Sequence, residues 1–440
     1  MHPRTRRLTS ALALVVAVML PASSAEAQRA AGPFAGLLGA GADVEARQTL
    51  DVSGSLFGAW DDTLTSSDAS AVDRRFLRSG LASGASGSVT HVRRSSLFQW
   101  QSGASSSLRL YGTKSSARAA TFSAQTSAST RVAQRVSLSA SGGWSYSPYY
   151  SFAPGYDGRL SNEGAFGGGF GVATAAKRNT ILSAGGGMSW QLSRRDTFSL
   201  GSSVSRSAFL DQSGLDINAW AANARFGHQL TRALGFRAGF GRTQATYQSA
   251  GNTPATSDTI ELGIDYGDAL VFRGRQTSLS FAWSTGAVRW NDETRFRLNG
   301  SAALTRGFGR AGSAALQYNR ATDFEAGFRQ PVLRDTVSAG VNNQLGTRTT
   351  WSTQVSYARG TIGFGSSAGR YTSYNAGGGM SVAVTRRIGV FTDYSVYRYE
   401  VPSGATVFTS LPKFSRQSVT AGLSLWAPLI ADKRSSRDSR

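Results

Sequence analysis

The chain has 440 residues, no cysteine and three histidines, with 47 Lys+Arg against 26 Asp+Glu. The absence of cysteine excludes disulfide scaffolds, thiol nucleophiles and cysteine-ligated metals, and three scattered histidines disfavour a histidine metal cage or a catalytic triad. We therefore expect no metal, no cofactor and no enzymatic activity. The formal net charge of +21 favours anionic partners such as nucleic acid, anionic membrane or anionic solutes.

Residues 1–27 have the features of a cleaved signal peptide. Arg4, Arg6 and Arg7 precede an unbroken apolar run from Ala11 to Leu20, and Ala25-Glu26-Ala27 is a small-x-small cleavage site. We therefore expect an exported protein, and export disfavours nucleic acid as the partner. Residues 28–46 are predicted to be a periplasmic N-terminal segment, either a linker or a short plug.

From residue 47 to residue 426 apolar and small polar residues alternate. In the clearest segment Val136, Leu138, Ala140, Gly142, Trp144 and Tyr146 alternate with Ser137, Ser139, Ser141, Gly143 and Ser145. Successive strand residues point to opposite faces, so each segment has one apolar and one polar face. The segments run to about 10–14 residues, longer than the ~5–6 usual in soluble sheets and suited to a tilted membrane strand. Small polar side chains could not pack a soluble core, but they suit a wet lumen.

We predict eighteen strands, and an even number is typical of single-chain bacterial barrels. Their ranges are 47–60, 77–91, 97–111, 118–129, 135–147, 165–192 (irregular), 197–208, 217–230, 233–245, 257–270, 277–290, 294–305, 311–321, 335–346, 351–362, 371–385, 388–399 and 415–426. Short turns with Thr or Ser before Arg recur, as at Thr231-Arg232 and Thr385-Arg386, whereas the segments 61–73, 148–163, 247–256, 322–331 and 401–412 are longer. Short turns at one rim and longer loops at the other are typical of membrane barrels.

Tryptophans cluster near the predicted strand ends, as in the interfacial aromatic girdles of membrane proteins. If the first strand rises from the periplasm, Trp60, Trp144, Trp220 and Trp290 fall near the outer rim, and Trp100, Trp190, Trp351 and Trp426 fall near the periplasmic rim. A soluble core would instead bury tryptophan near strand centres.

The last predicted strand carries a further signal. Val419, Gly422, Leu423, Leu425 and Trp426 form an alternating segment with a glycine and a late aromatic residue. It resembles the C-terminal strand by which bacterial outer-membrane barrels are recognised for insertion, although a polar tail, 427–440, follows it. Over residues 47–426 the chain resembles the porin-like class of bacterial outer-membrane proteins. The resemblance implies a transmembrane antiparallel up-and-down β-barrel of about 18 strands (16–20), with membrane lipid and the barrel-assembly machinery as partners.

By parity, six charged side chains point into the lumen: Arg109, Arg225, Arg237, Glu261, Asp265 and Arg297. Two interpretations carry equal weight, a transverse field that orients solutes and a set of salt bridges that braces the wall. The loop 148–163 follows the fifth strand, as the constriction loop of general porins does, and its tyrosines could stack on sugars or lie at the rim.

The sequence thus favours a porin-like channel for small polar or anionic solutes in the bacterial outer membrane. Two alternatives stay open. One is an outer-membrane component of an exopolysaccharide export system, with export proteins as partners. The other is a structural barrel with a closed lumen.

Overall fold

The computed structural model describes residues 47–63, 80–111, 117–149, 178–211, 216–248, 251, 253–266, 277–308, 311–324, 330–363, 369–400 and 413–432. The predicted signal peptide, the segment 28–46 and residues 433–440 of the tail lie outside these ranges. Within them, no helix is long and apolar enough to cross a membrane.

The described residues form eighteen β-strands. They are β1 Gln48–Thr63, β2 Gly80–Arg94, β3 Phe98–Tyr111, β4 Ala117–Ala133, β5 Val136–Ser147, β6 Asn179–Gln191, β7 Asp196–Phe209, β8 Ile217–Gln229, β9 Leu234–Tyr247, β10 Thr253–Tyr266, β11 Thr277–Trp290, β12 Glu293–Phe308, β13 Gly312–Asp323, β14 Val332–Leu345, β15 Thr349–Ile362, β16 Gly369–Ala383, β17 Ile388–Glu400 and β18 Lys413–Asp432.

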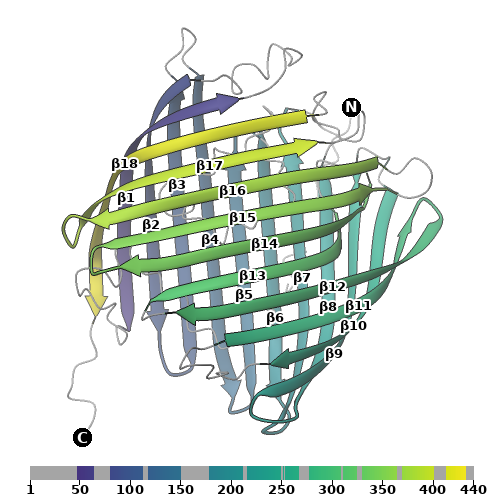
Figure 1. Cartoon of the computed structure of the whole chain (residues 1–440). Coiled ribbons are helices and arrows are strands. Elements are labelled where there is room, and N and C mark those ends of the chain that lie inside the picture. The colour runs from purple at the N-terminus through teal and green to yellow at the C-terminus, as the bar shows by residue number, and fades with distance from the viewer. Residues whose placement is uncertain are drawn as a thin grey trace, which may run out of the picture.

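Each strand pairs antiparallel with its neighbours in sequence, and β1 also pairs with β18 along its full length, from Gln48 opposite Asp432 to Thr63 opposite Arg416. This pairing closes the sheet into one up-and-down barrel with tilted strands (Figure 1). Closure leaves no free sheet edge, as a membrane barrel requires, because lipid cannot satisfy backbone hydrogen bonds. The prediction of an all-β barrel of eighteen strands is confirmed.

The alternation of the sequence sorts side chains between an outer face and a lumen face. Residues opposite one another in the register share a face, and the large exposed side chains Leu56, Leu182, Phe240, Ile260 and Leu298 all lie on the outer face. Most of their neighbours one residue away carry small or polar side chains toward the lumen, and Phe57 and Ile181 are the exceptions. The wall is therefore apolar outside and polar inside, the reverse of a soluble barrel.

The two rims differ in the length of their connections. At the turn rim, where β1 starts and β18 ends, short links such as 95–97, 134–135 and 346–348 join the strands. At the loop rim longer stretches of sequence separate the strand ends, as between β1 and β2, β5 and β6, and β17 and β18. Two connections depart from this asymmetry: 267–276 is long at the turn rim, and 291–292 is short at the loop rim. Asn291 and Asp292 have φ of 46° and 63°, as a two-residue type I′ hairpin turn requires.

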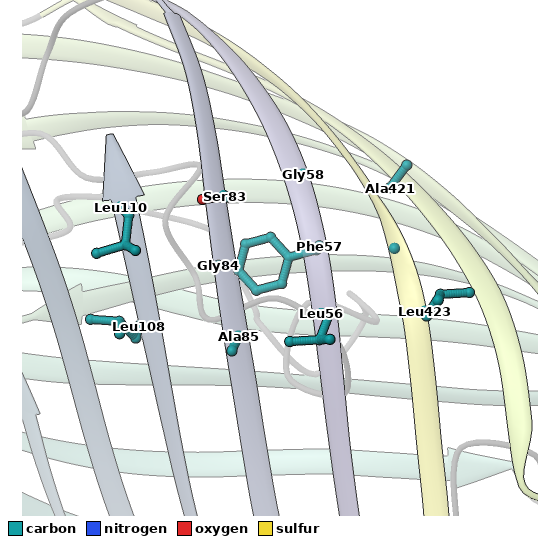
Figure 2. A pocket seen from close by; sticks show the side chains of 11 residues that line it. Leu56, Phe57, Gly58, Ser83, Gly84, Ala85, Leu108, Leu110, Ala421 and Leu423 are labelled. Atoms are coloured by element: carbon teal, nitrogen blue, oxygen red, sulfur yellow. The ribbon is translucent and has the colours of Figure 1, made fainter. Parts of the chain in front are cut away.

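The outer face carries an apolar groove of about 530 Å³ where β18, β1, β2 and β3 meet (Figure 2). Gly58, Ser83 and Ala421 keep its floor low, and leucines flank it. Phe57 of β1 faces the lumen, and its ring lies over Gly84 of the neighbouring strand β2. A Cβ on Gly84 would lie 2.6 Å from the Leu108 carbonyl oxygen and would overlap the Phe57 ring, so glycine makes room for the ring.

Several predicted strand ranges differ from the observed ones by a few residues, and the largest difference in the described residues is at the end of β18. The irregular range 165–192 contains β6 only from Asn179 to Gln191, and residues 165–177 lie outside the described residues. The last strand does not end at Trp426 but continues to Asp432, so the first residues of the predicted polar tail belong to the wall. A register shift between Leu50 and Asp51 leaves Leu429 unpaired beside Pro428, and this bulge lets the strand pass the proline.

The lumen as candidate functional site

The lumen face of β4 to β8 is a solvent-exposed surface of small polar side chains. These residues come from the polar half of the alternation, and each is exposed although it faces the barrel interior. They are Ser123, Gln125, Ser141, Ser183, Ser203, Ser205 and Asn223. Hydroxyl and amide groups that face the lumen and are reached by solvent make a wall for water and polar solutes.

Four of the six predicted lumen charges form one network on β8, β9 and β10. Arg225 donates to Glu261 at 2.8 Å, and Arg237 donates to Glu261 at 2.9 Å and to Asp265 at 2.5 Å. Arg237 lies flat across Gly263, where a Cβ would come within 2.6 Å of its Nε. The charges of the two arginines and the two carboxylates cancel within this network. The geometry therefore favours salt bridges that brace the barrel wall over a transverse field that orients solutes.

Arg109 lies in a second network at the seam of the barrel. Asp61 of β1 accepts hydrogen bonds from Arg109 of β3 and from Arg416 of β18, with an N–O distance of 3.0 Å in each ion pair. All three side chains are at most 3% exposed. The Asp61 group, as we call these three residues, crosslinks the first, third and last strands. Sequence reasoning missed both Asp61 and Arg416. Asp61 fell just beyond the predicted end of the first strand, and without Asp61 nothing in the sequence singled out Arg416.

Arg297 lies on the lumen face of β12, apart from both networks. It is opposite Gly286, whereas Glu261 is opposite Ser284 in a different cross-strand row. On the same face Arg295 forms an ion pair with Glu293 at 3.5 Å. The structure therefore does not bring the six predicted lumen charges together into one site.

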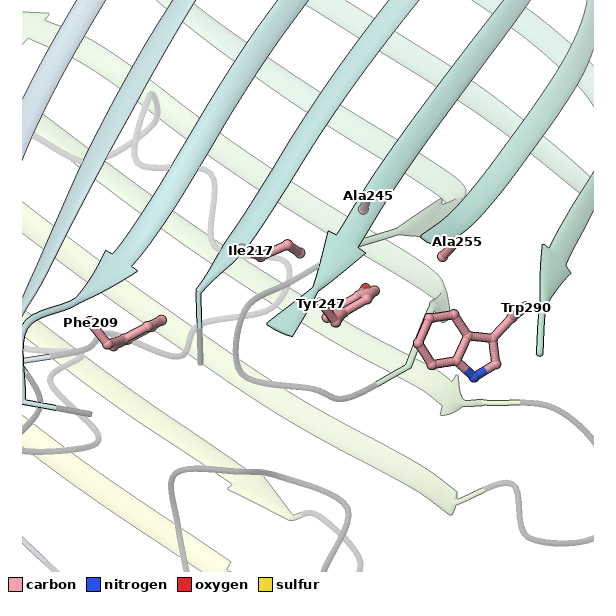
Figure 3. Packing of buried hydrophobic residues seen from close by; sticks show 6 residues of the cluster. All are labelled: Phe209, Ile217, Ala245, Tyr247, Ala255 and Trp290. Atoms are coloured by element: carbon pink, nitrogen blue, oxygen red, sulfur yellow. The ribbon is translucent and has the colours of Figure 1, made fainter. Parts of the chain in front are cut away.

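A second missed feature is a set of buried aromatic residues on the lumen face near the loop rim. Phe209, Ile217, Tyr247 and Trp290, from β7, β8, β9 and β11, pack with Ala245 and Ala255 (Figure 3). The Tyr247 and Trp290 rings meet edge to face with their centroids 5.4 Å apart. The cluster forms a buried apolar part of the lumen face next to the exposed polar wall of β4 to β8.

The structure places six of the eight predicted girdle tryptophans on the outer face. Trp60, Trp144 and Trp220 lie near the loop rim, and Trp100, Trp190 and Trp351 lie near the turn rim. The prediction is wrong for Trp290 and Trp426, which face the lumen. In β11 and β18 the outward residues occupy odd positions, as the exposed Trp283 and Leu425 show. Trp290 and Trp426 occupy even positions, so the alternation alone could have shown that they face the lumen.

In the predicted insertion strand, Val419, Leu423 and Leu425 are exposed on the outer face. Gly422 faces the lumen beneath Phe57 and Phe391, which form a small buried cluster with Ala59. The outward residues thus keep the alternation expected of the segment.

Only the first two residues of the predicted loop 148–163 are described. Tyr149 is 4% exposed and packs against Ala119 and Tyr111 on the adjoining wall. Burial raises the pKa of its phenol, and Arg109 and Arg416 act in the opposite direction, so the group stays neutral. Tyr149 is therefore not free to stack on a sugar. The other tyrosines of the loop lie outside the described residues.

A hydrolytic centre would need histidine beside serine, because the imidazole must take the hydroxyl proton. On the outer face His228 contacts Asp196 at 2.6 Å, and the hydroxyl of Ser193 donates to the same carboxylate at 2.5 Å. The carboxylate lies between the serine and the histidine, so the imidazole does not activate the hydroxyl. In the described ranges no three metal-ligating side chains form a group that could hold a metal ion.

No family model matches the chain, and no curated protein matches it. Solved structures that match include the crystal structure of Pseudomonas aeruginosa OpdQ, with 11% identity, 87% of this chain and 98% of that chain covered, and a TM-score of 0.43. Pseudomonas aeruginosa OccK2 (OpdF) in complex with glucuronate matches with 9% identity, 87% and 98% coverage and a TM-score of 0.45. Acinetobacter baumannii OccAB4 matches with 11% identity, 87% and 99% coverage and a TM-score of 0.42.

Proposed function

We propose that this barrel lies in the bacterial outer membrane and forms a water-filled channel for small polar or anionic solutes. The observation that carries the proposal is the solvent-exposed polar wall of β4 to β8 inside a closed barrel of eighteen strands. Barrels of 16–18 strands are wide enough to leave an aqueous lumen. A purely structural barrel with a closed lumen would bury these serines.

The outer face supports the location. Exposed leucines, phenylalanines and isoleucines cover it, and tryptophans lie toward both rims, where indole favours the headgroup zone. The signal-peptide features of residues 1–27 agree with export. We further propose that the barrel-assembly machinery inserts the chain, with β18 as the recognised strand.

We propose a modest preference for anions, which the excess of 47 Lys+Arg over 26 Asp+Glu in the chain favours. The network around Glu261 is balanced, with two arginines and two carboxylates, whereas the Asp61 group has two arginines and one carboxylate. Arginine is opposed by carboxylate in both networks, so most of the described lumen charge is compensated and we expect the selectivity to be weak. Much of the net charge of +21 lies at the turns and on the outer face rather than in the path of a solute.

The test is a planar bilayer recording with the refolded mature chain under a KCl gradient. We expect stable ohmic current steps and a reversal potential shifted from zero toward the equilibrium potential of chloride. A cation-selective reversal potential would contradict the anion preference. Absence of steps from protein that migrates as a folded, heat-modifiable band would contradict the channel itself.

A further inference from the structure

Near the loop rim, the outer face of β13 to β17 carries four arginines. Arg320, Arg359, Arg370 and Arg398 each lie within the last or first few residues of their strands. The register places Arg320, Asp335, Arg359, Thr372 and Glu400 opposite one another in a single cross-strand row. Outward-facing charge is costly in hydrocarbon, so this row belongs at the level of the headgroups.

A second row, one step further from the loop rim, is largely aromatic. Tyr318, Val337, Tyr357 and Tyr374 follow one another across β13 to β16, and Arg398 of β17 ends the row. The Tyr357 and Tyr374 rings lie 4.9 Å apart, and Tyr374 is exposed. Tyrosine prefers the membrane–water interface, so the aromatic row marks the boundary directly below the charged row.

One strand shows the whole profile. The outward side chains of β15 are Thr349, Trp351, Thr353, Val355, Tyr357, Arg359 and Thr361 in order from the turn rim. An aromatic residue lies toward each end of this series, with small or apolar residues between them, and the arginine lies beyond the second aromatic residue. Arg359 is thus placed where the phosphate groups of a lipid would lie.

The charged row together with Arg370 and Arg398, which lie in the neighbouring rows, holds four arginines and two carboxylates. Arg320 pairs with Asp335 at 3.5 Å and Arg398 pairs with Glu400 at 2.7 Å. Arg359 and Arg370 are exposed, and neither forms an ion pair with a carboxylate of the described residues. They are diagonal neighbours, because Arg370 is opposite Thr361, two residues beyond Arg359. Asp335, opposite Arg359, accepts instead from Tyr318 at 2.8 Å and pairs with Arg320. Two adjacent guanidinium groups that form no carboxylate ion pair suit an anion with several oxygens.

We propose that Arg359 and Arg370, flanked by Arg320 and Arg398, bind the phosphate groups of an anionic glycolipid in the outer leaflet, of the lipid A type. Guanidinium binds phosphate through paired, charge-assisted hydrogen bonds, and the tyrosine row contacts the start of the acyl region. The inference rests on the proposed outer-membrane location, and it commits to a lipid because the row borders the apolar band.

The experiment compares the binding of three probes to the full chain refolded in detergent: diphosphoryl lipid A, dephosphorylated lipid A and inorganic phosphate. The test variant is R359Q/R370Q. The control is R232Q/R386Q, which removes the same charge from exposed residues at the turn rim. Binding is read from the concentration dependence of the melting temperature.

We expect wild type and R232Q/R386Q to bind diphosphoryl lipid A alike, and R359Q/R370Q to bind it at least about tenfold more weakly for each arginine removed. Dephosphorylated lipid A and inorganic phosphate should bind far more weakly to every variant. Equal affinity of R359Q/R370Q and wild type for diphosphoryl lipid A would overturn the proposal, as would equal binding of the dephosphorylated lipid. Absence of current steps in the planar bilayer, together with normal binding of diphosphoryl lipid A, would contradict the proposed channel but not the lipid site.

Discussion

Replacing Asp61 by asparagine removes the only carboxylate of the Asp61 group and leaves Arg109 and Arg416 buried beside a neutral amide. Both arginines contact Asp61 at 3.0 Å and the three side chains are at most 3% exposed. Removing one partner of a buried ion pair costs about 3–5 kcal/mol, since the other charge stays desolvated. We expect a loss of stability in that range for D61N.

The assay is urea unfolding of the refolded barrel in detergent, followed by tryptophan fluorescence and by the heat-modifiable gel shift. The matched control is D265N, which removes a carboxylate that is 43% exposed, and we expect it to cost less than about 1 kcal/mol. R416M should fall between the two, because it leaves Arg109 and Asp61 as a balanced pair.

Equal stability of D61N and D265N would refute the argument, because burial would then make no difference to the ion pair. A larger loss for R416M than for D61N would also contradict it. That order would show that the packing of the Arg416 stem, rather than its charge, stabilises the seam between β18 and β1.

Two further predictions follow. G84A should lower the free energy of unfolding by about 1–3 kcal/mol, the usual cost of overpacking, because the new methyl group meets the Phe57 ring. The control G87A should unfold like wild type, since the nearest atom to its new Cβ is 3.8 Å away. Equal urea midpoints for G84A and G87A would contradict the close fit of Phe57 on Gly84. E261Q should raise the chloride-to-potassium permeability ratio by up to about fivefold, which moves the reversal potential toward that of chloride. The reason is that a lumen carboxylate and an ion ~4 Å away in water interact by about 1 kcal/mol. D335N, on the outer face, should leave the permeability ratio unchanged, and a shift toward potassium in E261Q would contradict the lumen assignment.

The faces of the wall could be predicted from the sequence because alternation is a local property. In β5 the apolar and serine positions separate without any knowledge of neighbouring strands, and they separate the same way in the structure. The same rule places Arg225 and Glu261 on one face. It does not give the register between strands, so the pairing of these two residues at 2.8 Å comes only from the structure.

The residue contacts across the closing seam were the part that sequence reasoning could not reach, although it predicted a closed barrel. Asp61 and Arg416 are 355 residues apart and meet only because β1 pairs with β18. The end of β18 was missed for a different reason. Proline usually ends a strand, but the bulge opposite Asp51 accommodates Pro428, and a bulge leaves no signal in the alternation before it.

The open polar lumen is tested most directly by single cysteines, which are unambiguous because the chain has none of its own. Ser203 faces the lumen and Val204 the outer face of β7. In reconstituted single channels, a charged, membrane-impermeant thiol reagent should lower the conductance of S203C and leave that of V204C unchanged. Unchanged conductance of S203C after modification confirmed by mass spectrometry, or equal block of both variants, would contradict a solute path along β4 to β8.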